Sequence, residues 1–192
     1  MTYRFLIVYA SRHGQTEAIA HYLLGELSRQ FHSAIAVDAE RLPKNLDVLD
    51  YDAVIVGAPV LRGKHLAAAK RFVTNYRAKL DRVATGFYSV SLAMATPSHD
   101  GRFRASTYVE RFTRATSWKP GLTARFAGAL AYRRYGLALR LLIRAIARYR
   151  RLSTDTSKDH EFTNWSRVDE FLTDMISVLE KDRRADRLDT PA

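Results

Sequence analysis

The sequence predicts a single α/β domain built on a five-stranded parallel sheet with helices on both faces. Short apolar runs alternate with amphipathic helical patterns along the chain. With 192 residues and 47% hydrophobic content, the chain is long enough for one well-buried domain and short for two. Five strands favour the order 2-1-3-4-5, in which a ligand binds at the carboxyl ends of the strands, around the point where the order reverses.

Five short apolar runs are predicted to form the strands. The third run is continuously apolar, as expected for a strand that helices cover on both faces. In chain order, the expected strands occupy residues 3–9, 34–37, 51–58, 86–92 and 125–130.

Between these runs, apolar residues recur at helical spacing. Ile19, Leu23 and Leu27 share one face of a helix that follows the first strand. The same pattern predicts helices over 64–80, 103–117 and 165–181. Because no internal repeat or low-complexity linker divides the chain, residues 1–180 are expected to form one domain. Residues 181–192 are polar and are expected to be a frayed C-terminal tail.

The segment between the first strand and the first helix has the composition of a phosphate-binding loop. It reads Ala-Ser-Arg-His-Gly-Gln-Thr and leads directly into the helix. Unpaired N–H groups and the positive end of the helix dipole hold an anion at such a position. The loop has neither the lysine of nucleotide P-loops nor the glycine pattern of dinucleotide folds. The expected phosphate contacts, mostly through backbone N–H groups, are Ser11, Arg12, His13, Gly14, Gln15 and Thr16.

The pattern Ser-x-x-Gly-x-Thr after the first strand resembles the FMN-phosphate loop of the flavodoxins. The alternative is an ordinary strand–helix turn capped by serine or threonine. In flavodoxin-like folds two further loops pack against the flavin ring, and the corresponding segments follow the third and fourth strands. The expected ring contacts are Pro59, Val60, Leu61, Arg62 and Gly63, together with Ser89, Val90, Ser91, Leu92 and Ala93.

Arg62 is the one cation among these ring contacts. A cation beside the ring stabilises reduced flavin and raises its potential, which favours oxidation of a substrate over low-potential electron transfer. The alternative is that Arg62 is a solvated loop arginine.

The charge and composition of the chain narrow the function further. The net charge of +11 and the isoelectric point near 10.1 indicate an anionic partner: nucleic acid, an acidic lipid surface or a carboxylated small molecule. Electron-shuttle flavodoxins are usually acidic, so this basicity argues against a pure shuttle. Since no nucleic-acid recognition motif is present, no nucleic-acid partner is expected. The absence of cysteine excludes disulfides, thiolate metal sites and a cysteine nucleophile, and the histidines lack metal-ligand spacing, so no metal is expected.

Several segments together resemble one enzyme family. They are residues 11–17, 87–92 and 127–135, Thr-Asp-Thr at 154–156 and Thr-Asn-Trp at 163–165. In order and spacing they resemble the menaquinone-dependent protoporphyrinogen IX dehydrogenases, which are flavodoxin-like enzymes of bacterial haem synthesis. The resemblance implies non-covalently bound FMN, oxidation of protoporphyrinogen IX to protoporphyrin IX, and delivery of the electrons to a respiratory quinone, either menaquinone or ubiquinone. It departs at His13, where enterobacterial-type members carry an acidic residue.

Two other functions remain open on the same fold: an FMN electron shuttle and an NAD(P)H:quinone reductase, since fold alone does not decide function. No Ser/His/Asp set and no paired carboxylates are evident, so no catalytic residue is assigned. His13, His65 and His99 lie in segments expected to face the site, where they either relay protons or are simply solvated.

The residues between the fifth strand and the last helix, 132–160, are expected to form a basic insertion. Within 136–151, four arginines fall on one side of a helix, and leucine and isoleucine occupy much of the rest. Such a helix either lies on an anionic membrane surface, where a quinone-reducing enzyme meets its acceptor, or packs on its own domain. No apolar stretch approaches the roughly 20 residues that span a bilayer, and the early first strand leaves no room for a signal peptide. The protein is therefore expected in the cytoplasm, peripherally attached to the inner face of the cell membrane.

Substrate contacts are expected at the start of this insertion. Arg133 and Arg134 are expected to pair with the two propionates of the porphyrinogen, because guanidinium forks match carboxylates. Tyr132 and Tyr135 are expected to supply flat apolar surface for the macrocycle.

Overall fold

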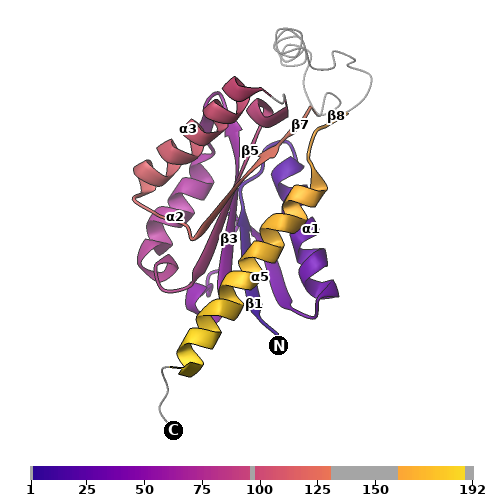
Figure 1. Ribbon diagram of the computed structural model, residues 1–192. Helices are drawn as coiled ribbons and strands as arrows, with labels where there is room; N and C mark the ends of the chain where they lie inside the picture. The colour runs from indigo at the N-terminus through magenta and orange to yellow at the C-terminus, as the bar shows by residue number, and fades with distance from the viewer. Residues whose placement is uncertain (1, 96–97, 131–159, 189–192) are drawn as a thin grey trace.

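A central parallel sheet organises the molecule in the computed structural model, which describes residues 2–95, 98–130 and 160–188 (Figure 1). Its five parallel strands are β1 (Arg4–Tyr9), β2 (Ser33–Asp38), β3 (Ala53–Leu61), β5 (Ala84–Ser91) and β6 (Leu122–Ala127). They lie in the order β2-β1-β3-β5-β6, which confirms the predicted order 2-1-3-4-5 for the parallel strands. A sixth, short strand, β4 (Lys64–His65), pairs antiparallel with the end of β3.

Helices cover both faces of this sheet. The helices α1 (Gln15–Arg29) and α5 (Trp165–Leu188) lie on one face, and α2 (Ala67–Leu80) and α3 (His99–Thr116) lie on the other. In β1, Phe5 and Ile7 pack toward α1 and α5, whereas Leu6 and Val8 pack toward α2 and α3. Successive residues of a strand point to opposite faces, so a strand covered on both sides is apolar at every position.

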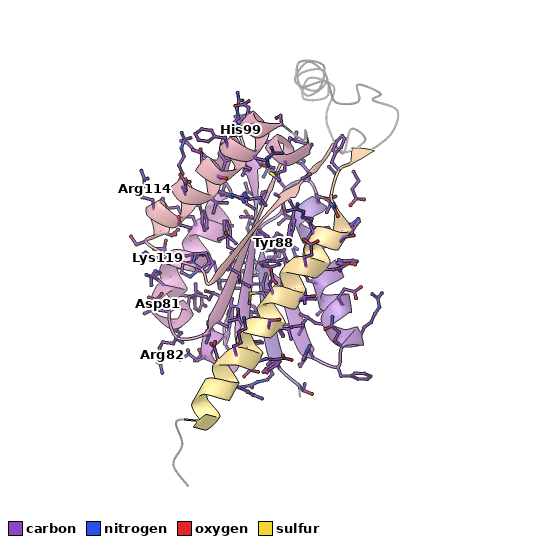
Figure 2. The ribbon with its side chains drawn as sticks, in the orientation of Figure 1. Asp81, Arg82, Tyr88, His99, Arg114 and Lys119 are labelled. Carbon is purple, nitrogen blue, oxygen red and sulfur yellow. The ribbon has the colours of Figure 1, made fainter. Side chains whose placement is uncertain are left out.

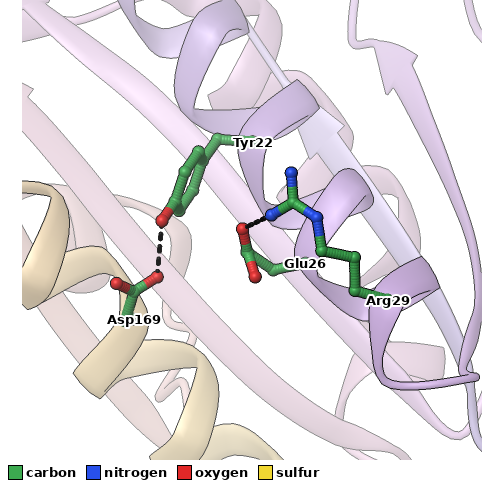
Figure 3. Close-up of polar contacts among 4 residues, drawn as sticks. All are labelled: Tyr22, Glu26, Arg29 and Asp169. Carbon is green, nitrogen blue, oxygen red and sulfur yellow. Dashed lines mark hydrogen bonds and ion pairs between the residues drawn. The ribbon is translucent and has the colours of Figure 1, made fainter.

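The helices α1 and α5 also contact each other along one edge (Figure 3). The Tyr22 hydroxyl donates a hydrogen bond of 2.8 Å to the Asp169 carboxylate, and the Tyr22 ring lies 4.6 Å from that of Trp165. On the next turn of α1, Glu26 pairs with Arg29. Because Trp165 and Asp169 follow the end of the insertion, these contacts hold the returning chain against α1.

The predicted boundaries around residues 59–66 were wrong. The third strand continues through Pro59–Leu61, and Lys64–His65 forms β4 instead of the start of a helix, so α2 begins only at Ala67. A two-residue turn causes the difference: Arg62 and Gly63 have φ angles of 49° and 78°, which direct the chain back as a hairpin. The segment expected as an open loop is therefore a β-hairpin.

Other boundaries shifted by a few residues. The strand β5 ends at Ser91 and is followed by a 3-10 turn, η2 (Leu92–Ala95). The helix α3 begins four residues earlier than expected, at His99, where Ser98 caps it. The fifth strand ends at Ala127, and β7 (Ala129–Leu130) pairs antiparallel with β8 (His160–Glu161). The last helix continues to Leu188, through part of the expected tail.

Residues 131–159 lie outside the described part of the chain. They include nearly all of the predicted insertion and the predicted substrate residues Tyr132, Arg133, Arg134 and Tyr135. Among the described helices, none combines the length and apolar composition that a membrane span requires.

Candidate functional site

The candidate site lies at the carboxyl ends of the parallel strands. There β1 and β3 are neighbours, but the chain leaves β1 toward α1 on one face and leaves β3 toward α2 on the other. This is the reversal point of the strand order, where open α/β sheets bind their ligands. A hydrogen bond of 2.9 Å from the Ala10 N–H to the Gly57 carbonyl joins the two departing segments.

The predicted phosphate loop follows β1 directly. Gly14 caps α1 with φ 95°, a left-handed conformation that a side chain would strain. The Ser11 hydroxyl accepts a hydrogen bond of 3.2 Å from the Gly14 N–H and so stabilises the turn. The N–H groups of the first helical turn have no partner within the helix, and with the helix dipole they provide an anion site at this position.

The side chain of one predicted loop residue, Gln15, holds the loop in place. The Gln15 side-chain amide donates to Glu161 at 2.9 Å and to the Thr163 hydroxyl at 2.8 Å. The Thr163 hydroxyl in turn donates to the Ala127 carbonyl at 2.8 Å. The Gln15 side chain therefore anchors the loop to the ends of β6 and β8, and its backbone N–H remains the group suited to an anion.

A buried tyrosine joins the phosphate loop to the middle of the sheet. The Tyr88 hydroxyl donates to the Thr16 carbonyl at 2.9 Å. The whole side chain is excluded from solvent, which raises its pKa well above the usual value. Figure 2 shows Tyr88 near the centre of the molecule. Tyr88 lies beside Gly57 in the strand register, and its ring occupies the space that a side chain at Gly57 would need. The first helical turn thus rests on a contact between β3 and β5.

His65 is a structural part of this site and not a solvated loop histidine. Its Nε2 lies 2.8 Å from the Ser89 hydroxyl, and its ring packs edge-on against Phe87 and Phe112. Burial lowers the pKa of His65 to about 4, so the ring is neutral near pH 7. The bond ties the β3–β4 hairpin to β5, and these are the two segments predicted to meet the flavin ring.

The Ser91 hydroxyl is a buried polar group that has no hydrogen-bond partner in the described chain. Ser91 is the last residue of β5, at the predicted ring position. An unsatisfied buried hydroxyl costs about 1–3 kcal/mol, so a ligand atom that pairs with it gains affinity. Together with the open first turn of α1, this group fits a flavin with its phosphate at the loop and its ring beside β5.

The structure brings most of the remaining predicted residues to the same edge. Arg62 is exposed at the tip of the hairpin, Arg12 is exposed on the phosphate loop, and His13 is half-buried beside it. His99 is exposed at the start of α3; Figure 2 shows it near the same end of the molecule. Among the described residues, no group of three histidine, aspartate or glutamate side chains is placed to hold a metal ion.

The role of Tyr88 and the bond between His65 and Ser89 were missed at the sequence level. Both depend on which strands are neighbours and in what register, and no local pattern carries that information. The one available signal was Gly57 within an otherwise bulky strand, since such a glycine often marks a close approach.

Comparisons with known proteins agree with the observed fold. A family model described as a flavodoxin domain matches residues 6–157. The chain is 31% identical over 176 residues to the protoporphyrinogen IX dehydrogenase (quinone) of Escherichia coli K12, covering 92% of this chain and 96% of that protein. It is 28% identical over 173 residues to the protein of the same name from Leishmania major, covering 90% of this chain and 74% of that protein. The solution structure of the two-electron reduced flavodoxin from Megasphaera elsdenii has a TM-score of 0.50 and 19% identity, covering 63% of this chain and 84% of that one, and this likeness shows the fold alone.

Proposed function

Because this chain belongs to the flavodoxin-domain family, and within it to the quinone-dependent protoporphyrinogen IX dehydrogenases, we propose that it oxidises protoporphyrinogen IX with bound FMN and a quinone acceptor. The product is protoporphyrin IX, and the reaction belongs to haem synthesis. The observation that carries the proposal is the 31% identity, which extends over 92% of this chain and 96% of the relative. Similarity that covers both chains almost completely supports a shared activity as well as a shared fold.

The residues present suit FMN. The open first turn of α1 and the backbone N–H groups of the loop, apart from the Gly14 N–H that bonds Ser11, would receive the phosphate. Gly14 permits the backbone to approach it closely. The hairpin 59–63 and the end of β5, with the free Ser91 hydroxyl, receive the ring. When bound, FMN supplies the redox chemistry by accepting hydride equivalents from the substrate and passing them to the quinone.

The side chains around the predicted ring position hold the ring segments in place and set the local charge. The bond between His65 and Ser89 holds the two ring segments at a set separation. Because the pKa of His65 is about 4, it places no positive charge there at physiological pH. Arg62, exposed at the hairpin tip, is the one cation among the predicted ring contacts and is suited to stabilise negative charge on reduced flavin.

Contact with the membrane is also part of the proposal, since a respiratory quinone stays in the bilayer. The arginine stripe of residues 136–151 supports it, as each arginine near an anionic surface contributes about 1 kcal/mol. The charge of the helices adds support: α2 and α3 carry eight basic and two acidic residues, whereas α1 and α5 carry six basic and eight acidic ones. Co-sedimentation with vesicles tests it. Binding should require anionic lipid, weaken with salt, and fall when Arg140, Arg144 and Arg148 are changed to glutamate.

An anaerobic titration tests the central activity. Protoporphyrinogen IX added to the FMN-loaded protein should remove the visible absorption of oxidised flavin, and a menaquinone or ubiquinone analogue should restore it as porphyrin fluorescence appears. Loss of the absorption with NAD(P)H would instead indicate a reductase of the same fold. A protein that binds FMN but reacts with neither donor would be an electron shuttle, and the proposal would be wrong.

The predicted substrate residues of the insertion are tested separately. Replacing both Arg133 and Arg134 by alanine should raise KM for the porphyrinogen, because their guanidinium groups are proposed to hold its propionates. An unchanged KM and kcat would show that the carboxylates are held elsewhere.

A further inference from the structure

A cavity of about 260 Å³ lies between the β3–β4 hairpin and the helices α2 and α3. We call it the hairpin pocket. The hairpin contributes Lys64 and His65, α2 contributes Lys70, and α3 contributes Tyr108, Arg111 and Phe112. Gly63 and Ala115 complete the lining, and Gly63 is the one lining residue that is also a predicted FMN contact.

Three cations line the hairpin pocket: Lys64, Lys70 and Arg111. No acidic residue lines it, and in the described part of the chain none of the three cations forms an ion pair. Other cations on the same two helices do find partners, as Arg77 does with Asp81. The pocket therefore concentrates positive charge that the protein itself does not neutralise, and an anion is the complementary ligand.

The walls between these cations are apolar. Phe112 lies against the ring of His65, with 5.0 Å between the ring centroids, and Phe112 stacks on Phe87 at 4.6 Å. Burial lowers the pKa of His65, so this wall is uncharged at neutral pH. A free inorganic anion gains little from such walls. A carboxylate carried on an apolar body matches both the charge and the walls.

The hairpin links the pocket to the predicted flavin position. Its segment 59–63 is predicted to meet the ring, and the adjoining residues 63–65 line the pocket. His65 borders the pocket and also contacts the Ser89 hydroxyl at 2.8 Å, in the second predicted ring segment. A substrate arm in the pocket therefore places the rest of the molecule on the hairpin, beside the ring.

We propose that the hairpin pocket binds one carboxylate arm of the porphyrinogen substrate, with Arg111, Lys70 and Lys64 as its anchors, so that only the other propionate is left for Arg133 and Arg134. The proposal rests on the proposed function and deepens it. A volume of about 260 Å³ lies below the ~300–1,000 Å³ of pockets that enclose a whole drug-sized ligand. The pocket thus holds one propionate and the adjacent edge of the macrocycle, and the macrocycle itself stays outside.

Charge-removing variants with matched controls test the proposal. Arg111→Gln and Lys70→Gln, alone and combined, remove two of the three anchors. Arg114→Gln and Arg71→Gln make the same change on the same helices at exposed positions that do not line the pocket; Figure 2 shows Arg114 pointing away from the sheet. Urea unfolding and FMN content of every variant should match those of the wild type, since no anchor contacts another described side chain as an ion pair.

Two readouts follow from carboxylate recognition. Each anchor variant should raise KM for protoporphyrinogen IX roughly tenfold, the effect of losing one charge-assisted hydrogen bond, while kcat changes less than about twofold because the flavin is untouched. In equilibrium fluorescence titrations, protoporphyrin IX should bind the anchor variants more weakly by the same factor. Its dimethyl ester, which has no charged carboxylate, should bind wild type and variants alike.

The outcomes separate this proposal from the proposed function. If the wild type oxidises protoporphyrinogen IX but the anchor variants behave like Arg114→Gln and Arg71→Gln, the pocket proposal is wrong and the proposed function stands. If the wild type fails to oxidise it but still prefers the diacid over the ester through Arg111 and Lys70, the pocket proposal stands and the proposed function is wrong. If the diacid and the ester bind the wild type equally, the pocket does not recognise carboxylates and the proposal is overturned.

Discussion

Replacing Gly57 by alanine should disrupt the core and the phosphate loop together. A Cβ at this position would lie 2.1 Å from Cζ of Tyr88 and 2.2 Å from its hydroxyl oxygen, far inside van der Waals contact. The Tyr88 side chain cannot move away from the added Cβ, because it is fully buried and its hydroxyl donates a hydrogen bond of 2.9 Å to the Thr16 carbonyl. Overpacking costs about 1–3 kcal/mol, and loss of the hydrogen bond adds about 1 kcal/mol. We expect the free energy of unfolding to fall by about 3 kcal/mol in total.

The assay is urea unfolding of the apo-protein, paired with an FMN titration followed by quenching of flavin fluorescence. Because Thr16 lies in the phosphate loop, FMN affinity should fall roughly tenfold, which corresponds to about 1.4 kcal/mol. Gly25→Ala is the matched control: its Cβ meets nothing within 4 Å in α1, so it should stabilise the protein by about 0.5–1 kcal/mol. If Gly57→Ala unfolds at the same urea concentration as the wild type, the contact between β3 and β5 does not constrain this site as described.

Three further predictions follow from the site. Ser91→Ala should leave the apo-protein equally or more stable, because it removes an unsatisfied buried hydroxyl. The same change should weaken FMN binding about five- to tenfold, because the hydroxyl is proposed to pair with the ring. A loss of apo-protein stability in parallel with FMN affinity would contradict this prediction. The pKa of His65 is about 4 in the folded state and about 6.5 in the unfolded state. Between these pH values the unfolded chain binds one more proton, so the free energy of unfolding should fall by up to about 3 kcal/mol as the pH drops from about 6.5 to 4. The unfolding midpoint of His65→Asn should lose this pH dependence, and a pH profile identical to that of the wild type would refute the argument. Gln15→Glu should replace a 2.9 Å hydrogen bond to Glu161 by a second carboxylate and lower the melting temperature by a few degrees at low salt. Gln15→Ala should lower the melting temperature less. If Gln15→Ala lowers it more than Gln15→Glu does, the amide does not act through Glu161.

The phosphate loop was predictable because its chemistry is local. Contiguous residues supply the strand end, the glycine turn and the first helical turn, so a sequence pattern is sufficient to find them. The structure adds that side-chain and backbone groups of the loop have different roles. The Gln15 side chain anchors it to Thr163, almost 150 positions along the chain, while the backbone N–H groups are left for the anion.

The hairpin shows where local reasoning failed. Lys64 and His65 continue into a helical pattern, and the turn before them is Arg-Gly, without the asparagine or aspartate that usually signals a tight hairpin. Pairing of Val60 with His65 and of Leu61 with Lys64 outweighs helix propensity, because the hairpin also buries His65 against Phe87 and Phe112. That burial comes from strands and helices distant in sequence.

The sequence by itself determined the alternation of strands and helices and the position of the anion-binding turn. These follow from the periodic placement of apolar residues and from one short contiguous motif, both of which act over a few residues. Only the tertiary structure decided that Tyr88 lies over Gly57, that His65 bonds Ser89, and that Lys64, Lys70 and Arg111 meet in one pocket. Each of these contacts depends on strand register and on how helices pack across a sheet. Such long-range geometry produces no repeating pattern of residues in the sequence.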